Sequence, residues 1–205
     1  MSTPPAPLVG AVLAAGGSRR LGRPKQLLAL HGRPLLQHVL AAAAAGGLDR
    51  VVLVLGAAAD EVEAAIAPLP GTRVVRNAAW AEGQASSLRA AIGAMPADAG
   101  GMVVLLGDQP TVRPEAVRAV TAAAVAGAAP IVRAGYRDGP GHPVAIARAL
   151  WPRLAALEGD LGAREIVRAD PALAATVAVD GPAPPDVDTE EDYARLVDGA
   201  ASPTG

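Results

Sequence analysis

The length and composition of the chain exclude several classes of protein. It has 205 residues, of which 51% are hydrophobic and 2% aromatic, no Phe, no Cys, and a formal net charge of −2. Without Cys, disulfides and thiolate metal sites are excluded, and the composition suits the reducing cytoplasm, where we expect the protein. The near-neutral charge gives no general attraction to nucleic acid or to an anionic membrane, so we expect neither as a partner.

The domain organisation that we expect is a flexible tail at residues 1–7, a single domain at 8–198 and a flexible tail at 199–205. A chain of this length buries a sizeable core as one domain. Its start, MSTPPAP, lacks the positive and apolar regions of a signal peptide. The apolar stretch from Leu35 to Leu48 is interrupted by polar residues and glycines, so it falls short of the roughly 18 residues of a membrane span. We expect a soluble monomer.

Short apolar runs alternate with helical patterns along the chain. The runs predict strands at 9–13, 51–55, 72–76, 102–106, 130–133, 144–147 and 176–179, and the patterns predict helices at 35–45, 60–67, 87–95, 114–126, 148–157 and 163–168. Nearly continuous apolar runs are typical of strands buried on both faces, and their alternation with helices predicts parallel crossovers. The stretch GYRDGPGHPV predicts a hairpin, so we expect a three-layer α/β/α, Rossmann-like fold with a mostly parallel, mixed sheet. A last helix follows Thr189, with Asp192 at the capping-box position.

The first expected strand runs into a glycine-rich loop, AAGGSRRLGRPK, at residues 14–25. Its spacing matches neither a Walker A loop nor the dinucleotide fingerprint G-x-G-x-x-G. Gly16 and Gly17 let the backbone approach a ligand closely, and Ser18 adds a hydroxyl. Positive charge comes from Arg19, Arg20, Arg23 and Lys25. Because ligands bind at the carboxyl ends of strands in open α/β sheets, we expect a triphosphate here, the alternative being a solvated surface turn.

The strand expected at 102–106 ends in GDQP, which places Asp108 at a second strand end. A carboxylate is costly at the end of a buried strand unless a partner neutralises it, and a divalent cation that bridges to a nucleotide phosphate is such a partner. Asp108 is therefore a candidate magnesium ligand. The alternative is that it caps the turn before the helix that begins at Pro114.

The two motifs taken together are more specific than either alone. LAAGGSRRLGRPK followed by LLGDQP resembles the nucleotidyltransferase family with the pattern L-A-A-G-x-S-x-R-M-G-x-x-K and a G-D-x-P metal motif, from which only Leu21 departs, in place of Met. The stretches NAAWAEGQASSLRAAI, GPGHPVAIARALWPRLAAL, GDLGARE and DVDTEEDYARL are similar to the molybdenum cofactor cytidylyltransferase branch of the molybdopterin-guanine-dinucleotide-synthase-like family. The resemblance extends from about Val9 to Leu196, nearly the whole chain.

This resemblance implies transfer of CMP from CTP to the terminal phosphate of the molybdenum cofactor (molybdopterin), with release of pyrophosphate and formation of a cytosine dinucleotide. The implied cofactor is Mg²⁺, and the implied recipient of the product is a molybdenum hydroxylase. Because the attacking phosphate is already ionised, catalysis would consist of positioning and charge neutralisation. Two alternatives stay open: a guanylyl- or sugar-phosphate nucleotidyltransferase of the same fold, and a non-catalytic accessory protein that binds the cofactor for a molybdenum hydroxylase.

The resemblance also implies roles for individual residues. The implied catalytic residues are Arg20, Lys25 and Asp108. The implied nucleotide-binding residues are Leu13, Ala14, Ala15, Gly16, Gly17, Ser18, Arg20, Lys25, Asn77, Gly83, Ser86, Ser87 and Asp108. The implied substrate-binding residues, on the pterin side, are Gln109, His142, Asp160 and Arg164. The implied metal ligands are Asp108 and Asp188, with Asp186 kept as an alternative.

Two further residues near the expected base pocket are informative. Ala15 stands where guanylyl-transferring relatives have Gly, and its methyl group is expected to favour the smaller pyrimidine base. Trp80 is either a lid or a packed aromatic side chain.

Overall fold

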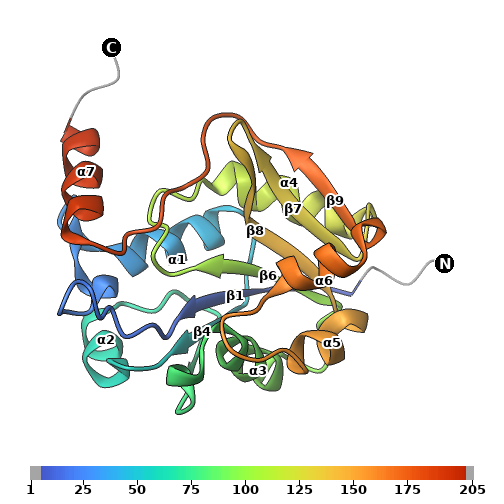
Figure 1. The fold of residues 1–205 in the computed structure, drawn as a ribbon, viewed down its shortest axis with the longest axis horizontal. Helices are drawn as coiled ribbons and strands as arrows, with labels where there is room; N and C mark the ends of the chain where they lie inside the picture. Colours follow the sequence, from blue (N-terminus) through green and yellow to red (C-terminus); the bar gives the residue numbers. More distant parts are fainter. Residues whose placement is uncertain (1–5, 202–205) are drawn as a thin grey trace.

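A seven-stranded mixed sheet forms the middle layer of the computed structural model, which describes residues 6–201 (Figure 1). Its strands are β1 (Leu8–Ala14), β4 (Val51–Leu55), β5 (Thr72–Arg76), β6 (Gly101–Leu106), β7 (Ile131–Tyr136), β8 (Gly139–Ala147) and β9 (Ala174–Ala178). They lie in the order β5-β4-β1-β6-β8-β7-β9. Only β8 runs antiparallel to its neighbours, β6 and β7, so the predicted mostly parallel, mixed sheet and its hairpin are confirmed.

Helices cover both faces of the sheet. Core packing places α1 (Leu35–Ala45), α2 (Ala59–Ala65) and α4 (Pro114–Val125) on one face, and α3 (Gln84–Ala94), α5 (Trp151–Ala155) and α6 (Ala163–Ala169) on the other. Alternate residues of the strands enter the two cores: Val12 and Val103 pack on the first face, Ala11 and Val104 on the second. This period of two explains why the strands read as continuous apolar runs.

The structure departs from the predicted elements at several ends, for example at β8, which begins at Gly139 and not at 144, and in the type of two elements. The helix predicted at 148–157 is instead a 3-10 turn (Arg148–Leu150) followed by the short helix α5. Two short strands that the sequence did not predict, β2 (Ala29–Leu30) and β3 (Arg33–Pro34), form a hairpin. Its turn residues, His31 and Gly32, have φ angles of 49° and 75°, as a tight hairpin turn requires.

Helix α7 (Glu190–Ala201) is the last element and lies beside α1 and the segment that follows the glycine-rich loop (Figure 1). A small apolar cluster joins these parts, formed by Leu21, Leu28, Leu30, Leu35 and Val187, with Tyr193 and Leu196 packed against it. The helix reaches into the predicted tail at 199–205, while residues 1–5 and 202–205 of the two predicted tails lie outside the described residues.

The start of α7 has the capping box that the sequence predicted. The hydroxyl of Thr189 accepts a hydrogen bond from the Asp192 amide at 3.1 Å, and the Asp192 carboxylate accepts one from the Thr189 amide at 2.8 Å. These two bonds satisfy amide groups that the first turn of a helix otherwise leaves unpaired.

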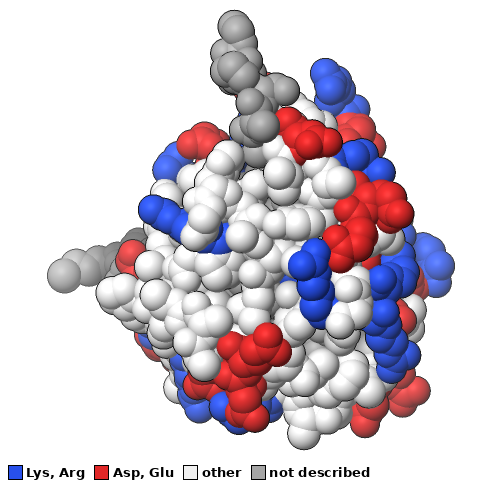
Figure 2. Space-filling model, turned by 90° about the vertical axis from the view of Figure 1, so that its left-hand side faces the viewer, with Lys and Arg blue, Asp and Glu red and all other residues white. Residues whose placement is uncertain are grey.

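The surface of this region mixes charges of both signs. Figure 2 shows Lys and Arg side chains next to Asp and Glu side chains on the face turned toward the viewer. At the start of α7, Arg23 pairs with Glu190 at 2.9 Å. No helix within residues 6–201 is long and apolar enough to cross a membrane.

Candidate active site

Three segments far apart in the sequence meet at the carboxyl ends of β1 and β6. These strands are parallel neighbours, and the Gly107 amide donates to the Leu13 carbonyl at 2.8 Å, so the glycine-rich loop and Asp108 emerge side by side. The Val187 amide donates to the Asp108 carbonyl at 3.0 Å, which brings in the segment before α7. The glycine-rich loop, basic side chains and carboxylates thus lie together at this edge of the sheet.

Lys25, the single lysine of the chain, lies between two carboxylates. Its ammonium nitrogen Nζ donates to Asp108 at 2.6 Å and to Asp188 at 2.7 Å. Burial acts to lower the pKa of Lys25, but the charges and hydrogen bonds of Asp108 and Asp188 outweigh it and raise that pKa above its usual value. Arg20 donates to the second oxygen of Asp188 at 2.8 Å. Asp108 and Asp188 are therefore each hydrogen-bonded to a cation of the glycine-rich loop.

An open pocket of about 630 Å³ lies in front of these groups. Its lining residues are Leu13, Ala15, Gly16, Gly17, Ser18, Arg19, Arg20, Lys25, Trp80, Ala81, Gly83, Gln84, Ser87, Leu106, Asp108, Asp160 and Asp188. Most of the residues assigned from the resemblance are among them. Those that do not line it are Ala14, Asn77, Ser86, Gln109, His142, Arg164 and Asp186.

Asn77 and Ser86 support the pocket from behind. Asn77 is buried, and its amide nitrogen Nδ2 donates to the hydroxyls of Ser86 at 2.8 Å and Ser87 at 3.2 Å. Because Ser87 lines the pocket, its hydrogen bond from Asn77 holds a pocket residue in place at the start of α3. Trp80 also lines the pocket and lies close against Gly17, where a Cβ atom would be only 2.8 Å from the indole ring.

The two aspartates before α7 have different partners. Asp188 faces Lys25 and Arg20, and the hydrogen bond from Lys25 contributes most to lowering the pKa of this carboxyl. Asp186 instead accepts a hydrogen bond from Gln109 at 2.8 Å, and burial raises its pKa, with the negative charge of Asp108 adding to the shift. Asp188 is therefore the carboxylate that pairs with Asp108 across the ammonium of Lys25.

The residues assigned to the pterin side come from different parts of the chain: Gln109 follows β6, His142 lies in β8, Asp160 precedes α6 and Arg164 lies in the first turn of α6. His142 is at the start of β8, which reaches the site edge because β8 is antiparallel to β6. Burial lowers the pKa of His142 from 6.5 to about 4; the charge of Asp108 opposes this shift and that of Arg164 adds to it, so the ring is neutral at pH 7. Asp160 accepts the Gln84 amide at 3.3 Å and so caps α3.

The carboxylate pair fits a divalent cation. One oxygen of Asp108, Oδ1, is buried and has no hydrogen-bond partner in the described part of the chain. Asp108 and Asp188 both contact one atom, so a single cation can contact both. Within residues 6–201 no group of three or more acidic, His or Cys side chains forms a complete metal site, so phosphate or water would have to supply the other ligands.

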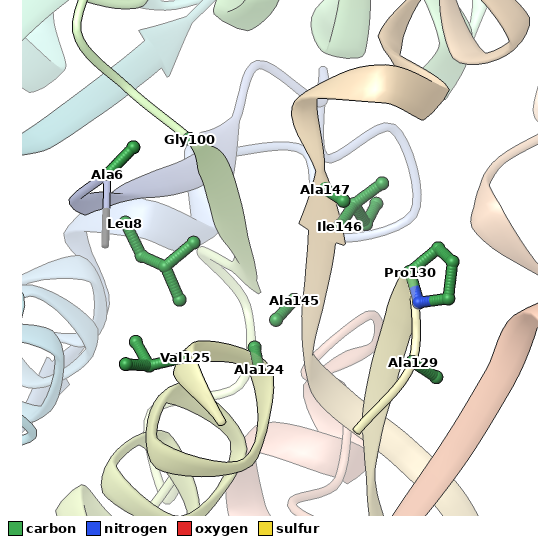
Figure 3. A pocket seen from close by; sticks show the side chains of 10 residues that line it. All are labelled: Ala6, Leu8, Gly100, Ala124, Val125, Ala129, Pro130, Ala145, Ile146 and Ala147. Carbon is green, nitrogen blue, oxygen red and sulfur yellow. The ribbon is translucent and has the colours of Figure 1, made fainter. Parts of the chain in front are cut away.

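A second pocket, of about 190 Å³, lies at the other end of the strands (Figure 3). It lies beside Leu8, at the start of β1, and Gly100, just before β6. All its lining residues are apolar or glycine. It therefore offers no groups for acid–base or phosphate chemistry.

The capped start of α7 allows the roles of neighbouring residues to be separated. We expect Asp188→Ala to raise the divalent-cation concentration for half-maximal activity by roughly tenfold to a hundredfold, because a ligand is lost. Thr189→Ala is expected to cost about 1 kcal/mol of folding stability, or about 2–4 °C in Tm, with an unchanged metal dependence. The metal dependence is measured by titrating the initial rate with the divalent cation, and the stability is measured by thermal melts. The same measurements on Asp186→Ala show which of the two aspartates changes the metal dependence. If neither Asp variant changes the metal titration, the segment is structural only.

Comparisons with known proteins identify the family of this chain. Residues 10–176 match the MobA-like NTP transferase domain. The nicotine blue oxidoreductase of Paenarthrobacter nicotinovorans is 35% identical over 198 residues, which cover 93% of this chain and 96% of that protein. The bifunctional protein GlmU of Sorangium cellulosum (strain So ce56) is 40% identical over 121 residues, but the match covers 56% of this chain and only 26% of GlmU.

Solved structures are similar to the chain over nearly its whole length. The crystal structure of Rv0371c from Mycobacterium tuberculosis H37Rv is 41% identical, with a TM-score of 0.84 over 93% of this chain and 97% of that one. A structure of Rv0371c in complex with manganese is 38% identical, with a TM-score of 0.80 over 93% and 98% of the two chains. The nucleotidyltransferase resemblance found in the sequence motifs is confirmed: this chain belongs to the family of MobA-like NTP transferase domains.

Proposed function

We propose that the chain is a CTP:molybdenum cofactor cytidylyltransferase. It transfers CMP from CTP to the terminal phosphate of molybdopterin and releases pyrophosphate. The observation that carries the proposal is the convergence of the glycine-rich loop, Lys25 and the carboxylates of Asp108 and Asp188 on one pocket. The branch-specific motifs of the sequence supply the choice of acceptor, and we propose His142 and Arg164, with Gln109 and Asp160, for the pterin side.

The reaction needs little proton chemistry from the protein. An oxygen of the acceptor phosphate attacks the α-phosphorus of CTP, and the bond from that phosphorus to the oxygen bridging to the β-phosphate breaks. We propose that Arg20 and Lys25, which line the pocket, hold the triphosphate by charge-assisted hydrogen bonds. Asp108 and Asp188 would hold Mg²⁺, which when bound neutralises charge on the phosphates. The remaining work of the chain is to orient the two substrates.

The choice of CTP is proposed to depend on Ala15. This residue lines the pocket, is buried, and lies so close to Gly56 that a Cβ atom there would be 2.8 Å from its methyl group. The methyl group therefore has a fixed position beside the pocket. A larger purine base would have to displace it.

We expect Ala15→Gly to lower the ratio of kcat/KM for CTP over GTP by roughly tenfold, the effect of one methyl-sized contact in a fitted pocket. Steady-state kinetics with both nucleotides measure the ratio. Ala41→Gly, at an exposed position of α1, is the matched control and is expected to leave the ratio unchanged. An unaltered ratio in Ala15→Gly assigns the base selectivity to other residues.

The proposed function is tested by incubating the protein with molybdenum cofactor, Mg²⁺ and each of the four ribonucleoside triphosphates separately. Pyrophosphate release and the dinucleotide product are measured. Pyrophosphate release with CTP and with none of the other three nucleotides supports the proposal. Pyrophosphate release with GTP and with none of the others supports the guanylyl alternative. Binding of cofactor and CTP without turnover would indicate an accessory protein.

The relative from P. nicotinovorans makes an oxidoreductase a second candidate, because its name refers to nicotine blue and the similarity covers nearly the whole chain. Since this chain has no Cys, it contains no dithiol to act as reductant. The test is therefore bleaching of nicotine blue with NADH or NADPH supplied. Bleaching that depends on the protein, with no pyrophosphate release, would overturn the proposed transferase.

A further inference from the structure

Gln26 lies directly behind the glycine-rich loop and does not line the pocket. It belongs to a short 3-10 turn (Lys25–Leu27), and its side chain is buried. Its amide nitrogen Nε2 donates to the carbonyl of Ala14 at 2.8 Å and to the carbonyl of Gly16 at 3.1 Å. One side chain thus holds two carbonyls at the base of the loop.

These two bonds also set the direction of the neighbouring amides. In a planar trans peptide the C=O and the N–H point in opposite directions. The Ala14 carbonyl shares its peptide with the N–H of Ala15, and the Gly16 carbonyl shares its peptide with the N–H of Gly17. Because both carbonyls point back to Gln26, both N–H groups point the other way. Ala15 and Gly17 line the pocket and Gln26 does not, which favours N–H groups that face the pocket.

The orientation of the Gln26 amide is fixed at a cost. Only its nitrogen can donate to carbonyls, so the oxygen Oε1 must point away from them. That oxygen is buried and has no hydrogen-bond partner among residues 6–201. A buried acceptor without a partner is unfavourable, and its presence indicates that the two donated bonds decide the arrangement.

We propose that Gln26 is a positioning residue that turns the N–H groups of Ala15 and Gly17 toward the phosphates of a bound nucleoside triphosphate. Without it the two carbonyls lose the donor that holds them, and a carbonyl turned toward the pocket would repel the phosphates. Backbone N–H groups that converge on one point form an anion-binding concavity. The inference rests on the proposed function only in taking the pocket as a triphosphate site.

The experiment measures binding of inorganic tripolyphosphate by calorimetry in metal-free buffer. This probe has no base and needs no acceptor, so it reports on the loop alone. Gln26→Leu removes both donors at similar size, and Gln26→Glu replaces the donating nitrogen with an acceptor. We expect both to weaken tripolyphosphate binding by roughly tenfold to a hundredfold, the effect of losing hydrogen bonds to a charged group. Gln37→Leu on α1, where a glutamine accepts the Ala67 amide at 3.1 Å, is the matched control.

A merely structural role predicts a different result, namely a lower Tm with unchanged tripolyphosphate binding, and that result overturns the proposal. If both Gln26 variants fail to fold, the native chain decides by NMR. Added tripolyphosphate is then expected to shift the amide proton signals of Ala15 and Gly17 downfield, and unmoved signals overturn the proposal. Failure of the proposed function is distinguishable, because tripolyphosphate binding that depends on Gln26 can persist without CTP-dependent turnover.

Discussion

Asp108→Asn is expected to fold as the native chain does and to lose turnover by roughly a hundredfold to ten-thousandfold. Asp108 holds Lys25 with one carboxylate oxygen, and its other oxygen is buried without a partner in the described residues. The amide of Asn keeps the size of the side chain but removes the negative charge that a divalent cation needs. Initial rates over a range of Mg²⁺ concentrations, beside a thermal melt, measure the effect.

The control for this variant is Asp98→Asn. Asp98 also pairs with a cation, Arg50, at 2.9 Å, but it does not line the pocket. We expect this variant to keep native turnover. Near-native turnover of Asp108→Asn at saturating Mg²⁺ would show that Asp108 is not the metal ligand.

Lys25→Met is expected to change two properties in opposite directions. Turnover should fall by roughly a hundredfold or more, because a charge-assisted contact with the triphosphate is lost. Binding of Mn²⁺ in the absence of nucleotide should become tighter, because Asp108 and Asp188 would lose the ammonium that now neutralises both of them. Arg20, which contacts Asp188, would still lie beside the bound metal.

The two properties are measured separately, by steady-state kinetics and by calorimetric titration with Mn²⁺. Arg153→Met, at an exposed position of α5, removes one positive charge elsewhere and is the matched control. If metal binding weakens together with turnover, the carboxylates depend on Lys25 for their placement. The interpretation that a metal takes the place of the Lys25 ammonium between Asp108 and Asp188 would then be wrong.

Most of the sheet and its main covering helices could be predicted because local patterns mark them. Strands such as 51–55, whose residues enter the two cores alternately, read as unbroken apolar runs. The pattern misled at 148–157, where apolar residues continue past the true end of α5 at Ala155. It also gave no sign of the hairpin formed by β2 and β3, since two residues per strand are too few to show a period.

Parts of the candidate site could likewise be predicted from the sequence, and other parts could not. The glycine-rich loop and Asp108 were found because they follow strands, and strand ends of neighbouring parallel strands share an edge. The contacts of Lys25 were not predictable, since its partners lie 83 and 163 residues away and no local pattern encodes such a pairing. Gln26 was missed for a related reason: a buried glutamine has no periodic signature, and only the folded structure shows that both of its bonds go to the loop.

Because a separate small apolar cluster joins α7 to the segment after the loop, removal of α7 is expected to abolish activity without unfolding the rest of the chain. Both large cores are complete without the residues from 186 onward, and the matched family region already ends at 176. A chain truncated before Asp186 would therefore keep its sheet and lose one of the two carboxylates. The position of Asp188 thus depends on the apolar contacts of Val187, Tyr193 and Leu196 and on the Asp188 amide, which donates to Asp192 at 3.1 Å.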